Sequence, residues 1–204
     1  MDSISNAIFE QPHHIATRAE ALSQPCPVPA VAGVYGWWFR SFPADIDTSA
    51  CISSGGLTLL YVGISPKQPP ANGRLPSRQN LRQRIRTHYC GNAEGSTLRK
   101  TLGCLLAPQL AIELRRVGSG NRMTFGTGEQ SLSQWMHDNA LVSWLVCDRP
   151  WEVEDQLITT LDLPLNLYGN SANAFHLTLT EIRAACVNRA RNLPVIANPG
   201  VGGR

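Results

Sequence analysis

The stretch GVYGWWF at residues 33–39, followed by LTLLYVGI at 57–64, decides the fold of this chain. Both segments are rich in β-branched and aromatic residues, which favours strands, and a loop that ends in serines and glycines separates them. The second segment is apolar enough to be buried on both faces. A third strand is predicted at 141–147, and the turn Ser119-Gly120-Asn121 predicts a hairpin over 111–126.

Helices are expected between and after these strands, because apolar residues recur there at helical spacing. Ser77 is the expected cap of the first helix after the second strand, and Ser96 or Thr97 caps the next. The predicted helices are 15–22, 77–89, 97–106, 129–139, 151–161 and 180–192. Strands and helices do not alternate regularly, so we predict an α+β fold, in which helices flank a small, mostly antiparallel central sheet.

Composition narrows the class of protein. Charged residues make up only 16% of the 204 residues, and five Trp, five Phe and four Tyr exclude a disordered chain. No apolar run reaches transmembrane length, and the first residues, with Asp2 and Glu10, lack the apolar core of a signal peptide. We therefore expect a cytoplasmic protein with no membrane partner.

The six cysteines form no closely spaced pair, which argues against structural zinc.

Positive charge is concentrated in one part of the chain. Between Lys67 and Arg122 there are eleven basic residues and two acids, Glu94 and Glu113, a balance of +9. The whole chain carries only +3, so the remainder carries −6. This asymmetry is typical of a surface that binds the phosphates of a nucleic acid, although a solvated helix face would look the same.

Glu154 occupies an unusual place on its predicted helix. At 100° per residue it falls within the apolar arc of Trp151, Ile158 and Leu161, while other polar residues take the opposite side. A buried, unpaired carboxylate is costly, so a metal ion or a basic partner must compensate it. The wheel alone does not separate a metal ligand from a structural ion pair.

The helix after the second strand carries a second set of polar residues. Arg84 and His88 lie four residues apart on one edge of its apolar stripe. An arginine can hold phosphate oxygens there while a histidine moves a proton, but a half-buried structural histidine also fits. Arg78, Arg82 and Arg86 follow at i, i+4 and i+8, and we expect this basic ridge to contact phosphates.

Together these elements resemble the GIY-YIG nuclease superfamily. Gly33-Val34-Tyr35 and Tyr61-Val62-Gly63 are similar to its two signature triplets, with valine in place of isoleucine in each. An Arg-x-x-x-His helix follows at 84–88, a Glu-x-x-Leu-Ile helix at 154–158 and a Pro-x-Asn turn at 164–166. The long insertions between these elements look more like the restriction-endonuclease branch, or the stand-alone bacterial proteins, than like homing endonucleases.

The resemblance implies metal-dependent hydrolysis of phosphodiester bonds. Glu154 would be the protein ligand of one Mg²⁺ or Mn²⁺ ion that keeps its waters. Tyr35 would be the general base for the attacking water, with Arg84 favouring its phenolate and clamping the phosphate. His88 would take the proton onward.

Further site residues carry supporting roles by the same resemblance. Tyr61 would hydrogen-bond the phosphate or the water, and its role could be exchanged with that of Tyr35. Asn166 would fix Glu154 or the helix that carries it. Gly33 and Gly63 would let the backbone approach closely, or are simple strand glycines. Lys67, just after the second triplet, could contact phosphate, as could the basic ridge.

The resemblance places a catalytic domain with insertions at 31–170. The sequence pattern outside it predicts a lead at 1–30, a C-terminal helical extension at 171–193 and a flexible tail at 194–204. Double-stranded DNA is the expected substrate. The alternatives are RNA, branched or damaged DNA, or a catalytically silent nucleic-acid-binding module. The oligomeric state stays open, a homodimer included.

Overall fold

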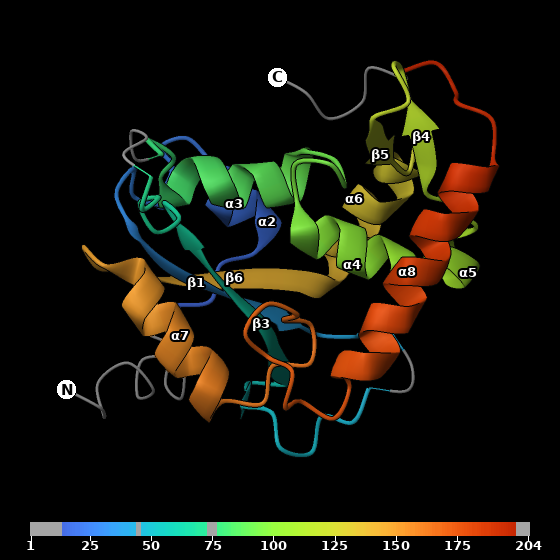
Figure 1. The fold of residues 1–204 in the computed structure, drawn as a ribbon. Helices are drawn as coiled ribbons and strands as arrows, with labels where there is room; N and C mark the ends of the chain where they lie inside the picture. The colour runs from blue at the N-terminus through green and yellow to red at the C-terminus, as the bar shows by residue number, and fades with distance from the viewer. Residues whose placement is uncertain (1–13, 44–45, 73–76, 199–204) are drawn as a thin grey trace.

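In the computed structural model of the chain, which describes residues 14–43, 46–72 and 77–198, an antiparallel sheet lies at the centre (Figure 1). Its four strands run in the order β2 (Ser53–Ser54), β3 (Leu57–Ser65), β1 (Gly33–Phe39) and β6 (Ala140–Val146). Every neighbouring pair is antiparallel. The predicted α+β class with a small antiparallel sheet is therefore confirmed.

The sheet separates two hydrophobic cores, because alternate side chains of a strand point to opposite faces. Tyr35, Trp37 and Phe39 of β1 join the larger core, while Val34 and Trp38 join the smaller one. Helices cover both faces, so all seven residues of β1 are buried. Helix α7 (Pro150–Thr160) closes the smaller core, and α3 (Leu81–Cys90) packs on the larger one (Figure 1).

Helix α3 begins later than the predicted cap Ser77. Asn80 is the actual cap: its side chain accepts the Gln83 N–H, and the Gln83 side chain accepts the Asn80 N–H in return. This reciprocal pair satisfies two backbone donors that would otherwise be free at the helix end. Arg78 consequently lies before the helix, in a segment without regular secondary structure, and cannot continue a ridge along it.

The other helices follow the sequence more closely. Ser96 caps α4 (Thr97–Leu105) as predicted, by accepting the Arg99 N–H. The remaining helices are α2 (Arg18–Ala21), α5 (Ala107–Leu110), α6 (Gly128–Asn139) and α8 (His176–Asn192). Helix α8 begins one turn before the predicted Thr180, whose hydroxyl donates to the His176 carbonyl as a residue inside the helix does. No helix among the described residues combines the length and the apolarity that a membrane span needs.

Both ends of the described chain pair with the domain. Ala16 exchanges two backbone hydrogen bonds with Val142 at the free edge of β6. The predicted hairpin is present as β4 (Arg115–Val117) and β5 (Arg122–Thr124), and Ile196 forms a parallel bridge with Val117. The first residues of the predicted tail at 194–204 are thus attached to β4, and residues 199–204 lie outside the described part of the chain.

Candidate active site

A cavity of about 420 Å³ brings together residues that are far apart in the sequence. It lies where β1 and β3 meet α3, α7 and the turn that follows α7. Six of the predicted site residues line it: Tyr35, Tyr61, Lys67, Arg84, Glu154 and Asn166. The fold therefore assembles both triplet tyrosines, two cationic side chains and the Glu154 carboxylate around one space large enough for part of a substrate.

Tyr35 is held in place from three sides. Its hydroxyl lies 2.8 Å from His88 Nε2, and Arg84 Nε donates to it over 3.4 Å. Its ring lies over Gly63, the residue opposite it in β3. A Cβ on Gly63 would come within 2.5 Å of the Tyr35 hydroxyl, so only glycine leaves room for the tyrosine. This explains the second triplet's glycine by side-chain packing around Tyr35.

Burial controls the protonation of Tyr35 and of its neighbours Tyr61 and His88. Burial, only partly offset by Arg84, raises the pKa of Tyr35 to about 12. Burial raises the pKa of Tyr61 further, so Tyr35 is the more acidic of the two. Burial first, and then the charges of Arg84 and Arg99, hold the pKa of His88 well below its usual range. His88 is therefore neutral at pH 7 and fully buried, not half-exposed.

Glu154 is the half-buried carboxylate of the cavity. Burial and the nearby Asp155 raise its pKa to about 7, although Lys67 and Arg84 lower it. Among the described residues no salt bridge or hydrogen bond of this carboxylate occurs, so the structural ion pair is not formed. Along α7, Val153 and Leu157 pack into the smaller core, Trp151 and Glu154 line the cavity, and Ile158 does both.

The donor set fits a divalent cation of the magnesium type. The described part of the chain holds no cluster of three His, Cys, Asp or Glu side chains that could surround a metal. A carboxylate without an ionic partner, whose raised pKa reflects a charge poorly compensated by the protein, nevertheless lines the cavity. Mg²⁺ suits one carboxylate and several waters, whereas zinc needs three or four protein ligands.

Asn166 was expected to fix either Glu154 or the helix that carries it, and its side chain contacts β3 rather than Glu154. Its side-chain oxygen accepts the Val62 N–H, and its side-chain nitrogen donates to the Val62 carbonyl, both over 2.9 Å. It does not hydrogen-bond Glu154. Asn166 instead fastens the turn after α7 to the centre of β3, which sets the distance between that helix and the second triplet.

The basic ridge is not a continuous feature. Arg82 and Arg86 are exposed on α3, and Arg78 is exposed ahead of it. Arg82 Nε donates to the Val28 carbonyl over 2.8 Å, which fixes part of its side chain. None of these three arginines lines the cavity, whereas Lys67 and Arg84 do.

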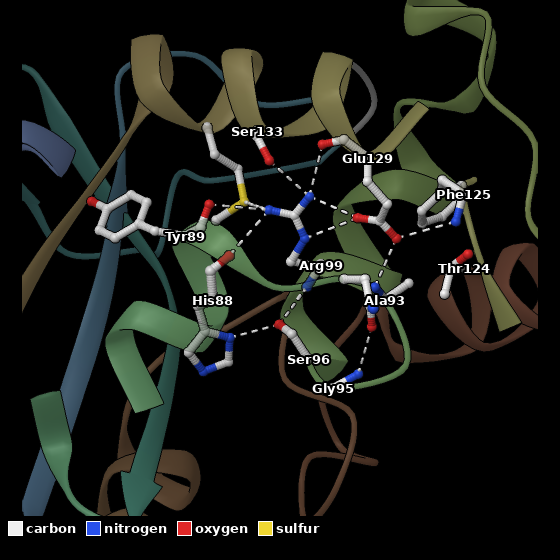
Figure 2. Close-up of polar contacts among 12 residues, drawn as sticks. His88, Tyr89, Ala93, Gly95, Ser96, Arg99, Thr124, Phe125, Glu129 and Ser133 are labelled. Carbon is white, nitrogen blue, oxygen red and sulfur yellow. Dashed lines mark hydrogen bonds and ion pairs between the residues drawn. The ribbon is translucent and has the colours of Figure 1, made fainter. Parts of the chain in front are cut away.

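One of the eleven basic residues is buried rather than exposed. Arg99 and Glu129 form an ion pair at 2.7 Å with side chains 0% and 1% exposed (Figure 2). Arg99 also donates to the carbonyls of His88 and Tyr89, and thereby holds the last turn of α3. Glu129 accepts the backbone N–H groups of Ala93 and Phe125. The charge of Arg99 is therefore neutralised inside the protein and does not add to a phosphate-binding surface.

This pair had no sequence signal, because its members lie 30 residues apart on two helices. Ser96 is a second residue whose contact could not be predicted from the sequence. Its hydroxyl lies 2.7 Å from His88 Nδ1, so the cap of α4 also contacts the predicted catalytic histidine. The spacing of Ser96 predicted only its capping function.

We expect Glu129→Gln to destabilise the protein by about 3–5 kcal/mol, because it leaves the buried Arg99 cation without its counter-charge. Urea unfolding followed by circular dichroism measures the effect. Glu152→Gln is the matched control: it breaks the exposed pair with Arg149, which is worth about 1 kcal/mol or less. Equal stabilities of the two variants would contradict the assignment.

Comparison with known proteins gives one match. The chain matches the GIY-YIG catalytic domain over residues 33–185, a range that includes both triplets and every lining residue of the cavity. No curated protein and no solved structure matches it. The family has a nuclease-type fold, and its nucleases generally use divalent metals. Because the match covers most of the chain, this protein belongs to the GIY-YIG catalytic domain family.

Proposed function

We propose that this protein is a divalent-metal-dependent endonuclease that hydrolyses phosphodiester bonds in double-stranded DNA. One observation carries the proposal: the Tyr35 hydroxyl, held between Arg84 and His88, shares a cavity with the unpaired carboxylate of Glu154. A general base, a cationic clamp and a metal-binding carboxylate are what hydrolysis of a phosphodiester requires.

The hydrogen-bond partners of Ser96 support one tautomer of His88. Ser96 Oγ accepts the Arg99 N–H, and its only other contact among the described residues is His88 Nδ1. A buried hydroxyl needs an acceptor, so Ser96 donates to Nδ1 and the ring proton resides on Nε2. His88 then donates to the Tyr35 oxygen. In this tautomer His88 would stabilise and orient the phenolate, and it could not take the proton of Tyr35 as the resemblance implied.

Tyr35 is the general base in this proposal. Its oxygen accepts hydrogen bonds from His88 Nε2 and Arg84 Nε, which leaves its own proton directed to the cavity. With a pKa of about 12, the phenol remains protonated at pH 7 until more positive charge is present. Glu154 would hold a divalent cation, which would supply such charge and stabilise the leaving oxygen, so that the phenol could release its proton to solvent in the cavity.

The cationic residues position the substrate. Arg84 is fixed by its hydrogen bonds to Tyr35 and to the Gly95 carbonyl, and its guanidinium faces the cavity, where it can hold a phosphate. Lys67 is exposed and also lines the cavity. Tyr61 lines the same space without a hydrogen bond to another described residue, so its hydroxyl is available to the phosphate.

Incubating the protein with plasmid, linear duplex, single-stranded DNA and RNA, in Mg²⁺ and in EDTA, tests the proposal. We expect nicking or cutting of duplex DNA in Mg²⁺ and none in EDTA. Cleavage confined to RNA would change the substrate. Binding of nucleic acid without any cleavage, in Mg²⁺ or Mn²⁺, would replace the enzyme with a binding module.

We expect the substitutions Arg78→Gln and Arg86→Gln to weaken DNA binding modestly and to flatten its dependence on salt. Each lost phosphate contact lowers the slope of log K against log salt by about one unit. Fluorescence anisotropy across a salt series measures the slope. Arg191→Gln, an exposed arginine near the end of α8, is the control. An unchanged slope in the double variant would remove these residues from the DNA-binding surface.

A further inference from the structure

Two aromatic side chains line the cavity without a role in the chemistry proposed above. Trp151 lies on α7 one turn before Glu154, and Tyr168 lies two residues after Asn166. Phosphodiester hydrolysis uses the tyrosines of the triplets, Arg84 and Glu154, and requires neither of these rings. Their place beside the catalytic groups therefore calls for another explanation.

Neither ring belongs to a hydrophobic core of the protein. Trp151 is only half-buried and Tyr168 is 89% exposed. Among the described residues, neither forms a hydrogen bond or stacks on another ring. One exposed aromatic residue is ordinary on a protein surface. Two that line the same cavity, from separate segments, form an apolar surface available to a ligand.

The turn that carries Tyr168 is held firmly. Asn166 is fastened to β3 through both of its side-chain hydrogen bonds to Val62. Asn170 Nδ2 donates to the carbonyls of Leu163 and Asn166 over 2.8 and 3.1 Å. Gly169, between them, adopts a φ of +71°, which favours glycine. Tyr168 is thus presented on a backbone that is already ordered, which reduces the entropy lost when a ligand binds.

The chemistry of the cavity identifies the ligand. Lys67 and Arg84 provide positive charge for a phosphate, and the two rings provide flat apolar surfaces beside it. A nucleotide with its base unstacked combines both properties, and stacking on protein aromatics is the usual way to bind such a base. Bases inside a regular duplex are stacked on one another and cannot reach these rings.

We propose that Trp151 and Tyr168 stack on an unpaired nucleobase next to the scissile phosphate, so that the preferred substrate is DNA with a locally unpaired nucleotide. This inference rests on the proposed nuclease function and narrows its substrate. The unpaired base is supplied by a bulge or a mismatch, or is extruded from the duplex on binding. The cationic residues hold the phosphate, and the aromatic residues select the unpaired base.

Binding in EDTA, where no cleavage is expected, tests the inference. The probes are one labelled duplex in three forms: fully paired, with a single-base bulge, and with an abasic residue in the place of the bulged base. We expect the bulged duplex to bind about tenfold more tightly than the abasic one. Trp151→Ala and Tyr168→Ala should each remove most of this difference, while Trp151→Phe and Tyr168→Phe should retain most of it.

The control variant is Leu177→Ala, which removes an apolar side chain 66% exposed at the start of α8, outside the cavity. It should bind all three probes like the wild type. Equal affinity of the wild type for bulged and abasic DNA, or alanine variants that keep the difference, would overturn the inference. If Mg²⁺-dependent cleavage persists in that case, the proposed nuclease function stands. Failure of the wild type to bind or cut any nucleic acid would instead overturn the proposed function.

Discussion

Replacing Glu154 by glutamine will abolish DNA cleavage in Mg²⁺ and leave DNA binding intact or tighter. Glutamine keeps the shape and the hydrogen-bonding capacity of the side chain but removes the charge that would hold the cation. Tighter binding is expected because one negative charge near the phosphates is gone. A plasmid nicking assay and fluorescence anisotropy measure the two effects. Glu152→Gln, an exposed carboxylate on the same helix outside the cavity, is the matched control.

The same variant will be more stable than the wild type at neutral pH without metal. The folded-state pKa of Glu154 is about 7, above the ordinary 4.5 of the unfolded chain. Between these two values the folded protein binds more protons, so its free energy of unfolding falls as the pH rises. The Gln variant lacks this fall. We expect its free energy of unfolding to exceed that of the wild type by about 1–3 kcal/mol at pH 8 and to equal it below pH 4.5.

Urea unfolding at a series of pH values measures this difference, and added Mg²⁺ should stabilise the wild type alone. Cleavage by the wild type should fall as the pH drops through about 7, because protonation of Glu154 competes with the metal. A variant that still cuts DNA, or a wild type indifferent to EDTA, would contradict the metal assignment. A large loss of stability in the variant would contradict the description of Glu154 as an unpaired carboxylate.

Tyr35→Phe will lower the turnover number by about 100-fold or more, because it removes the general base and keeps the ring. The ring packs over Gly63, so we expect a folded protein whose affinity for DNA is unchanged. Single-turnover cleavage in Mg²⁺ measures the rate of the chemical step. This separates loss of the base from loss of substrate binding.

Tyr61→Phe is the matched comparison, since the two tyrosines line the same cavity and Tyr61 has the higher pKa. We expect a smaller loss of rate from it, of the size of one hydrogen bond to the phosphate. Near-normal cleavage by Tyr35→Phe, with a severe loss in Tyr61→Phe, would exchange the two roles. Near-normal cleavage by both variants would assign the base to a metal-bound hydroxide.

Much of the fold was predictable because its elements depend on local patterns. The range of β1, the hairpin and the cap of α4 follow from strand propensity, turn residues and the Ser96 side chain. The start of α3 could not be predicted in this way, because Ser77 and Asn80 both precede the helix and both can cap it. The Asn80 N–H donates to the Gln83 side chain, which favours Asn80 as the cap. The helix therefore begins after Arg78.

The sequence by itself determined the α+β class, the family, and the position of Glu154 on the apolar side of its helix, because these depend on residue order and spacing alone. Only the tertiary structure decided which partners the polar side chains contact. It buried Arg99 against Glu129, attached Asn166 to Val62 and linked Ser96 to His88. Such partners are set by how helices from distant segments pack on the sheet. Burial then governs the pKa of each group, and spacing along the chain contains no information about it.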